Sequence, residues 1–140
     1  MKKLLSIVLM CLFFCSVAIV SVEAKGNVSD TAFTFQFRDY QPFTGWLTEY
    51  RAKLDDTSSY MKCTDASGKS YTAWVQASDP VNNPYYGTDV GSKKYTFLSG
   101  SERWMVNYVY ENGYRYARIE GQPNYSGTYK VTGVWSPDSV

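Results

Sequence analysis

The stretch Thr31-Ala-Phe-Thr-Phe-Gln-Phe-Arg38 alternates apolar and polar side chains along most of its length. In an extended chain, Phe33, Phe35 and Phe37 would point to one side and the residues between them to the other. This period of two is typical of a strand with one buried face, and aromatic side chains favour strands. The stretch therefore predicts a strand over residues 31–38 whose phenylalanines belong to a hydrophobic core.

Further short runs with strand composition alternate with turn-forming residues along the rest of the chain. The runs 58–64 and 70–77 flank the turn-rich segment 65–69, an arrangement that predicts a β-hairpin. Residues 46–54 are ambiguous, because partial alternation competes with a helical spacing of apolar residues. They have neither a helix cap nor a glycine stop, so we favour a strand or irregular extended chain there. Two more strands are expected, at residues 93–98 and 127–135.

A second hairpin is predicted around Asn112-Gly113, which joins the β-rich runs 104–111 and 114–121. Both turn residues tolerate the positive φ of a type I′ turn. The resulting register assigns one set of side chains to the core, namely Trp104, Val106, Tyr108, Ala117 and Ile119. The other face would carry a mixed aromatic and polar set, namely Met105, Asn107, Val109, Tyr114, Tyr116, Arg118 and Glu120.

These runs predict an all-β fold, a small antiparallel β-sandwich or barrel of seven or eight strands. Residues 25–140 contain no repeat, linker or convincing helix, so we expect a single domain with a mobile leader at 25–30. The Pro-, Gly- and Asn-rich residues 78–92 are expected to form a long surface loop, the kind of segment where binding function concentrates.

The first 24 residues have the three-part pattern of a secretory signal peptide. Met1-Lys2-Lys3 is a positively charged start, residues 4–22 form an apolar run, and Val22 and Ala24 are the small residues before the cleavage point. We therefore expect a signal-peptide helix that is removed after Ala24 and a mature chain that is secreted. An uncleaved membrane anchor is the alternative, since about 20 apolar residues span a bilayer.

Cleavage would leave 116 of the 140 residues, with 12 basic and 12 acidic side chains. A neutral chain without a basic run lacks the electrostatic pattern of a nucleic-acid binder or a polybasic membrane binder. Cys63 would be the only cysteine left, so a disulfide within the mature chain is excluded. We interpret Cys63 as a small core residue, with a covalent dimer as the alternative.

The chain has no histidine, which excludes Ser-His-Asp and Cys-His catalysis and histidine-containing zinc sites. A single mature thiol also excludes cysteine-only zinc sites, and no phosphate-binding glycine loop is present. We therefore predict no cofactor, no metal and no enzyme activity. A carboxylate-based hydrolase stays as an alternative, with the glutamates Glu49, Glu102, Glu111 and Glu120 as candidates. Four oxygen-bearing side chains fit no calcium-binding spacing and are interpreted as an ordinary polar loop: Asp79, Asn82, Asn83 and Asp89.

Aromatic residues are the other compositional anomaly, at 22 of the 116 mature residues. Most are expected to fill the sheets, but tyrosine also suits binding surfaces because its rigid ring loses little entropy on contact. The candidate ligand-binding residues are Tyr114, Tyr116 and Arg118 on the non-core face and Tyr85 and Tyr86 in the long loop. The alternative is that Tyr114 and Tyr116 only pair across strands or cover a second sheet.

Several segments from residue 59 onward resemble a family of small secreted proteins of Gram-positive, Bacillus-like bacteria that is defined only as a domain of unknown function. They are Ser-Tyr-Met-Lys (59–62), Ala-Trp-Val (73–75), Asn-Tyr-Val-Tyr-Glu-Asn-Gly (107–113), Tyr-Ala-Arg-Ile (116–119) and Gly-Val-Trp-Ser-Pro-Asp-Ser (133–139). The resemblance implies secretion and a bacterial origin, and it assigns no catalytic or binding residue.

The sequence thus favours a secreted, non-enzymatic β-domain that binds cell wall, a glycan or a surface protein. It predicts no nucleic-acid partner and no stable membrane span in the mature chain. A secreted antimicrobial or toxin-like protein is the first alternative, and the carboxylate hydrolase is the second.

Overall fold

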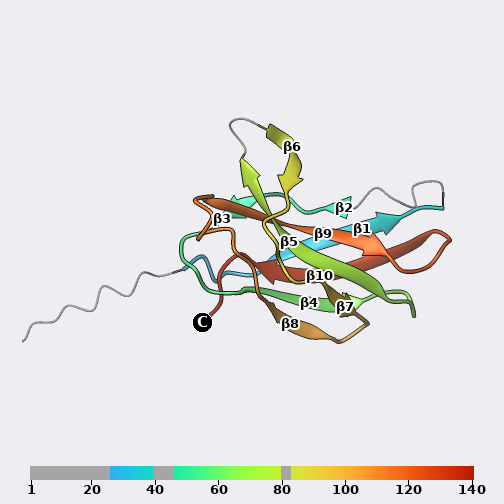
Figure 1. Cartoon of the computed structure of the whole chain (residues 1–140). Coiled ribbons are helices and arrows are strands. Elements are labelled where there is room, and N and C mark those ends of the chain that lie inside the picture. The colour runs from blue at the N-terminus through green and yellow to red at the C-terminus, as the bar shows by residue number, and fades with distance from the viewer. Residues whose placement is uncertain (1–25, 40–45, 80–82) are drawn as a thin grey trace, which may run out of the picture.

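The computed structural model describes residues 26–39, 46–79 and 83–140. These residues form two antiparallel sheets and no helix, so the all-β prediction is confirmed (Figure 1). The predicted signal-peptide helix lies outside the described residues. In the part of the chain that is described, no helix has the length and apolar character needed to cross a membrane.

The first sheet, called sheet A, has four strands in the order β1, β10, β4, β8. Their bounds are Thr31–Phe37 for β1, Tyr129–Ser136 for β10, Ser59–Asp65 for β4 and Glu102–Met105 for β8. The alternation that predicted β1 is confirmed, because Phe33, Phe35 and Phe37 are all buried.

The second sheet, called sheet B, is centred on the long antiparallel pair of β9 (Tyr116–Pro123) and β5 (Tyr71–Asp79). The two short strands β2 (Trp46–Leu47) and β3 (Arg51–Ala52) both pair with β9. On the other side, β6 (Asn83–Thr88) and β7 (Tyr95–Phe97) both pair with β5. The preference for strand or irregular extended chain at 46–54 is therefore confirmed, since β2 and β3 are separated by residues outside any strand.

Aromatic rings from both sheets fill the core between them. Phe37 and Tyr129 of sheet A lie 5.0 Å apart between ring centroids, and Tyr71 and Phe97 of sheet B stack at 5.4 Å. Phe35 joins the two groups through an edge-on contact with Tyr71 at 6.1 Å. Offset and edge-on ring pairs of this kind stabilise a core beyond their buried area.

Two glycines make room for these rings. A Cβ atom at Gly121 would lie 2.5 Å from the Phe35 ring, and one at Gly133 would lie 2.6 Å from the Phe33 ring and closer still to the carbonyl oxygen of Lys62. Real Cβ atoms essentially never approach this closely, so Gly121 is required by the Phe35 ring, and Gly133 by the Phe33 ring together with the backbone of β4. The aromatic composition and the strand glycines are thus parts of one packing solution.

The hairpin predicted for residues 58–77 is wrong in its pairing, although both strands exist. β4 belongs to sheet A and β5 to sheet B, so the connection crosses from one sheet to the other. This connection contains Ser67 and Gly68 at φ of 53° and 69°, and its Ala66 is part of the buried core. A short turn-rich segment can join two strands of one sheet or cross from one sheet to the other. Here it crosses, because each strand buries one face against the core from the opposite side.

The Asn112-Gly113 hairpin is also wrong. β8 pairs with β4, whereas β9 pairs with β5, so the two predicted arms lie in different sheets. Gly113 has a φ of 86°, but Asn112 does not have the positive φ that a type I′ turn requires. Its backbone N–H donates to the carbonyl of Tyr108 at 3.1 Å, which forms a wider, helix-like turn.

The core face predicted for residues 104–109 is reversed. Trp104, Val106 and Tyr108 are exposed, whereas the residues between them are buried, namely Met105, Asn107 and Val109. The alternation is real, but its phase is set by the pairing of β8 with β4 rather than with β9. Ala117 and Ile119 of β9 are buried as predicted.

The long loop predicted at 78–92 is shorter than expected, because β5 extends to Asp79 and β6 occupies residues 83–88. With β6 and the division of 46–54 into two strands, the described residues contain ten strands where seven or eight were expected. Cys63 is fully buried, as expected of a small core residue.

Candidate binding groove

An aromatic pair on the outer face of sheet A forms the wall of a groove. Along β4, Ser59, Met61 and Cys63 face the core, which directs Tyr60 outward. The register of β4 with β8 places Tyr60 opposite Trp104, and the two ring centroids lie 5.7 Å apart. The Trp104 side chain is 56% exposed, an unusual state for so large an apolar ring.

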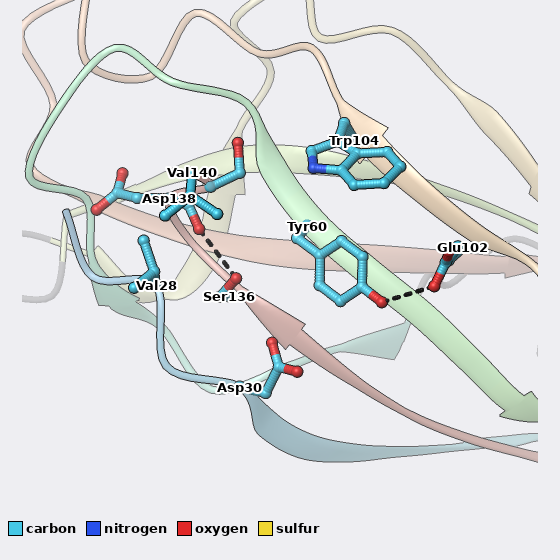
Figure 2. A pocket seen from close by; sticks show the side chains of 9 residues that line it. Val28, Asp30, Tyr60, Glu102, Trp104, Ser136, Asp138 and Val140 are labelled. Atoms are coloured by element: carbon cyan, nitrogen blue, oxygen red, sulfur yellow. Dashed lines mark hydrogen bonds between the residues drawn. The ribbon is translucent and has the colours of Figure 1, made fainter.

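The groove has a volume of about 340 Å³ and extends from this pair toward the segments before β1 and after β10 (Figure 2). Its lining combines apolar and acidic side chains, namely Val28, Asp30, Tyr60, Glu102, Trp104, Ser136, Asp138, Ser139 and Val140. An exposed tryptophan beside hydrogen-bonding groups is a common arrangement in ligand sites, where a few polar groups fix the orientation of an apolar contact.

The polar groups at the groove make it acidic. The Tyr60 hydroxyl donates a hydrogen bond to Glu102 Oε2 at 2.9 Å, and Lys62 lies 4.0 Å from the same oxygen. Partial burial, this hydrogen bond and the charges of Glu102 and Asp30 raise the pKa of Tyr60 to about 12. The phenol therefore stays protonated at all ordinary pH values, and the carboxylates beside it favour a neutral or cationic ligand over an anion.

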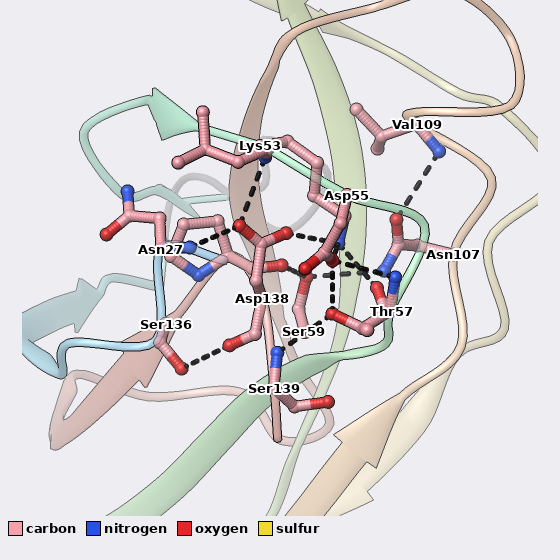
Figure 3. A network of polar contacts seen from close by, with 12 residues as sticks. Asn27, Lys53, Asp55, Thr57, Ser59, Asn107, Val109, Ser136, Asp138 and Ser139 are labelled. Carbon is pink, nitrogen blue, oxygen red and sulfur yellow. Dashed lines mark hydrogen bonds and ion pairs between the residues drawn. The ribbon is translucent and has the colours of Figure 1, made fainter. Parts of the chain in front are cut away.

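A buried polar network lies behind the groove and fixes the chain segment after β10 (Figure 3). Lys53 and Asp138 are both fully buried, and Lys53 Nζ lies 2.7 Å from Asp138 Oδ1. The other carboxylate oxygen of Asp138 accepts backbone hydrogen bonds from Asn27 and Leu54 at 2.6 and 3.0 Å. Burial alone would raise the pKa of Asp138, but these hydrogen bonds and Lys53 outweigh it and lower the pKa below its ordinary value.

The network continues to the other segments that meet at this end of the sandwich. Ser59 Oγ donates to the carbonyl of Pro137 at 2.7 Å, and the Asn107 side chain donates to Ser59 Oγ at 3.3 Å. Ser139 donates its backbone N–H to Thr57 Oγ1 at 3.1 Å. Because Ser136, Asp138 and Ser139 also line the groove, the network holds that wall in place.

The three candidate residues on and before β9 share neighbours, but they differ in exposure. Tyr114 packs against the core, whereas Tyr116 is 37% exposed and meets the ring of Tyr50 edge-on at 5.8 Å. Arg118 is only 5% exposed, and its guanidinium lies 5.7 Å from the centre of the same Tyr50 ring. Tyr114 and Tyr116 line a cleft of about 210 Å³ with Asp79 among its other residues.

Tyr85 and Tyr86 belong to β6, but their side chains lie outside the described part of the chain. Asn82 lies outside it as well, and Asp79 pairs with Asn83 across β5 and β6. Among the described residues, no group of three or more Cys, Asp or Glu side chains is placed to hold a metal ion.

The candidate glutamates are dispersed over the molecule. Glu102 lines the groove from β8 in sheet A, and Glu120 lies on β9 in sheet B. Glu49 lines a different depression with Arg51 and Trp135, and Glu111 is exposed in the turn before β9. These four carboxylates therefore do not converge on one site.

Sequence reasoning did not find the groove, because it assigned Trp104 to the core. The signal that would have found it is the alternation in 59–64, which puts Tyr60 on the same face as Lys62 rather than with Met61 and Cys63. Asp30 and Val28 are brought to the groove only by the tertiary structure, since they precede β1 and lie far from β8 in sequence.

The fold and the groove define a class of protein, an all-β sandwich with an exposed aromatic and acidic groove on one sheet. The chain belongs to the family described as "Protein of unknown function (DUF2712)", whose model matches residues 20–139. No curated protein and no solved structure matches the chain.

Proposed function

We propose that this protein is a secreted, non-enzymatic binding domain that attaches to a glycan of the bacterial cell wall through the Tyr60–Trp104 groove. The observation that carries the proposal is the exposed Trp104 ring, paired with Tyr60 at 5.7 Å beside Asp30 and Glu102. The apolar C–H faces of sugars pack on aromatic rings, and carboxylates accept hydrogen bonds from sugar hydroxyl and amide groups.

Export is part of the same proposal and rests on the charged start, apolar run and small-residue end of residues 1–24. The resemblance noted above supports an origin in Gram-positive, Bacillus-like bacteria, where a thick wall would be the first surface that an exported chain meets. Expression of the full chain in a secreting bacterial host would release a protein that begins at Lys25. N-terminal sequencing of the medium and cell fractions measures this.

Wall binding is tested by co-sedimentation of the purified protein with insoluble peptidoglycan. The wild-type protein is expected in the pellet, whereas Trp104→Ala would lower the affinity at least tenfold, a loss of about 1.4 kcal/mol. Trp104 is exposed, so this substitution removes the ring without opening a cavity in the core. Tyr60→Phe would weaken binding less, because it keeps the ring and removes only the hydroxyl that donates to Glu102.

Tyr125→Ala is the matched control. The Tyr125 ring is 55% exposed, close to the 56% of Trp104. It lies before the first residue of β10, whereas the groove lies beside the last residues of β10. The control is expected to bind like the wild-type protein. Equal losses for Tyr125→Ala and Trp104→Ala would show general adhesion by exposed rings and would contradict the groove, as would a wild-type protein that stays in the supernatant.

A further inference from the structure

Lys53 and Asp138 are placed for a reaction as well as for an ion pair. They are 85 residues apart in sequence, and they join the segment after β3 to the segment after β10. Neither side chain has exposed surface, and the amine nitrogen lies 2.7 Å from one carboxylate oxygen. A lysine amine and a carboxyl group in contact have together the atoms of one amide bond and one water molecule.

The two oxygens of Asp138 have different surroundings. Oδ1 faces Lys53, whereas Oδ2 accepts the backbone N–H groups of Asn27 and Leu54 at 2.6 and 3.0 Å. Two fixed N–H donors on one oxygen are the arrangement that stabilises a developing oxyanion when the attached carbon is attacked. Proximity and fixed orientation of two reacting groups lower the barrier further.

A second carboxylate completes the set. Asp55 Oδ1 lies 3.9 Å from Lys53 Nζ, held there by hydrogen bonds from the backbone N–H and the hydroxyl of Thr57. Lys53 Nζ also donates a hydrogen bond to the carbonyl of Thr57. That carbonyl would accept the single N–H of an amide in the same place, and the two backbone donors would satisfy the amide oxygen.

We propose that Lys53 and Asp138 form an intramolecular isopeptide bond after the chain has folded. One proton moves from Nζ to Oδ1, and the neutral amine attacks Cγ, which places negative charge on Oδ2. Asp55 carries a second proton from Nζ to the Oδ1 hydroxyl, the Cγ–Oδ1 bond breaks, and water leaves. Oδ2 becomes the amide oxygen, so an ammonium and a carboxylate yield one amide and one water with no further reactant.

The amide would remove the free-energy cost of burying two charged side chains. Two buried charges become one neutral group with its hydrogen bonds satisfied. The bond also closes a long loop in the unfolded chain, as a disulfide would, in a domain whose described residues contain a single cysteine. Because a proton must leave the amine before it can attack Cγ, we expect the bond to accumulate slowly in the folded protein.

Intact-mass measurement of the purified, full-length expression product tests this directly. The folded protein is expected to be lighter than its own sequence by one water molecule. Digestion with trypsin would leave the chain uncut after Lys53 and give a branched peptide that contains Lys53 and Asp138. Unfolding the protein in denaturant immediately after synthesis would prevent the loss of mass.

Two variants separate the roles of the residues. Lys53→Arg keeps the buried positive charge but lacks the amine nucleophile, so it is expected at full mass. Asp55→Asn keeps both reacting groups and removes the proton carrier, so its mass loss is expected to slow at least tenfold. Circular dichroism reports whether each variant folds. If a variant does not fold, the presence or absence of the branched peptide in the wild-type protein still decides the proposal.

Full mass in the folded wild-type protein after prolonged incubation would overturn the proposal. A water loss that persists in folded Lys53→Arg would also overturn it, because it would place the dehydration in a cyclised aspartate elsewhere in the chain. Neither outcome bears on wall binding by Trp104, so this proposal and the proposed function fail separately.

Discussion

At the scale of single residues, burial changes the chemistry of side chains that look ordinary in the sequence. Glu120 lies on β9 and accepts a hydrogen bond from the Gln76 side chain on β5. Burial raises the pKa of Glu120 above its ordinary value, Lys94 partly opposes this, and Asp89 adds to it. Lys94 itself lies 4.1 Å from the centre of the Trp74 ring, so this outer part of sheet B is covered.

The raised pKa of Glu120 makes the free energy of unfolding depend on pH in a defined direction. The folded state binds the Glu120 proton more tightly than the unfolded state, so this contribution is fully present below the ordinary glutamate pKa. It is lost as pH rises through the raised value. Glu120→Gln should therefore raise the free energy of unfolding at neutral pH, by less than about 1 kcal/mol after solvent screening, and leave it unchanged in acid. Urea unfolding at several pH values measures this, and an equal change at all pH values would contradict it.

At the scale of elements, the edge strand β8 shows how pairing decides which face is buried. Burial alternates with a period of two over 104–109, although β8 itself ends at Met105 and the predicted strand 104–111 is therefore too long. A one-residue change of phase exchanges core and surface. Met105 pairs with Ser59 and faces the core, whereas Trp104 pairs with Tyr60 and faces solvent. The partner strand, which the local sequence did not reveal, therefore created the groove.

Two neighbouring substitutions test this phase. Met105→Ala should lower the free energy of unfolding by about 2–5 kcal/mol, because it leaves a cavity in the core. Val106→Ala should change it by no more than about 0.5 kcal/mol, since Val106 is 42% exposed. Chemical denaturation of both variants measures the difference. If Val106→Ala lowered the free energy of unfolding more than Met105→Ala, the result would contradict this register and support the one predicted from the sequence.

At the scale of the whole molecule, the sandwich is held by packing of rings across the two sheets rather than by a disulfide in the described residues. Cys63 on β4 is fully buried and free. Its burial raises the pKa of the thiol, which disfavours the reactive thiolate. A buried thiol of this kind does not reach a second molecule without unfolding, which argues against a covalent dimer through Cys63.

Thiol reactivity and thermal stability test this together. The folded protein should react with a thiol reagent only at the rate of unfolding, whereas the protein in denaturant should react at once. A protein made of residues 25–140 should melt at the same temperature with and without reductant, and its gel-filtration elution volume should not change. A drop in melting temperature with reductant would reveal a disulfide that this packing does not contain.

Much of the fold was predictable from local patterns. The alternation of Phe33, Phe35 and Phe37, and of Ala117 and Ile119, marks one face of a strand whatever its partners are. The partners themselves were not predictable, because the turn-rich segment 65–69 allows a hairpin within one sheet or a crossing between two. Asn112-Gly113 is a strong local signal for a tight turn, and it was overruled by the better burial of β8 and β9 in separate sheets.

The β class, the positions of most strands and the absence of histidine chemistry can all be derived from the sequence, because composition and period are properties of the chain alone. Three features emerge only in the folded molecule: Tyr60 and Trp104 share a groove, Trp104 is exposed, and Lys53 contacts Asp138. Each of these depends on contacts between segments far apart in sequence. Such contacts are selected by the burial of the whole core, and no local window of residues contains that information.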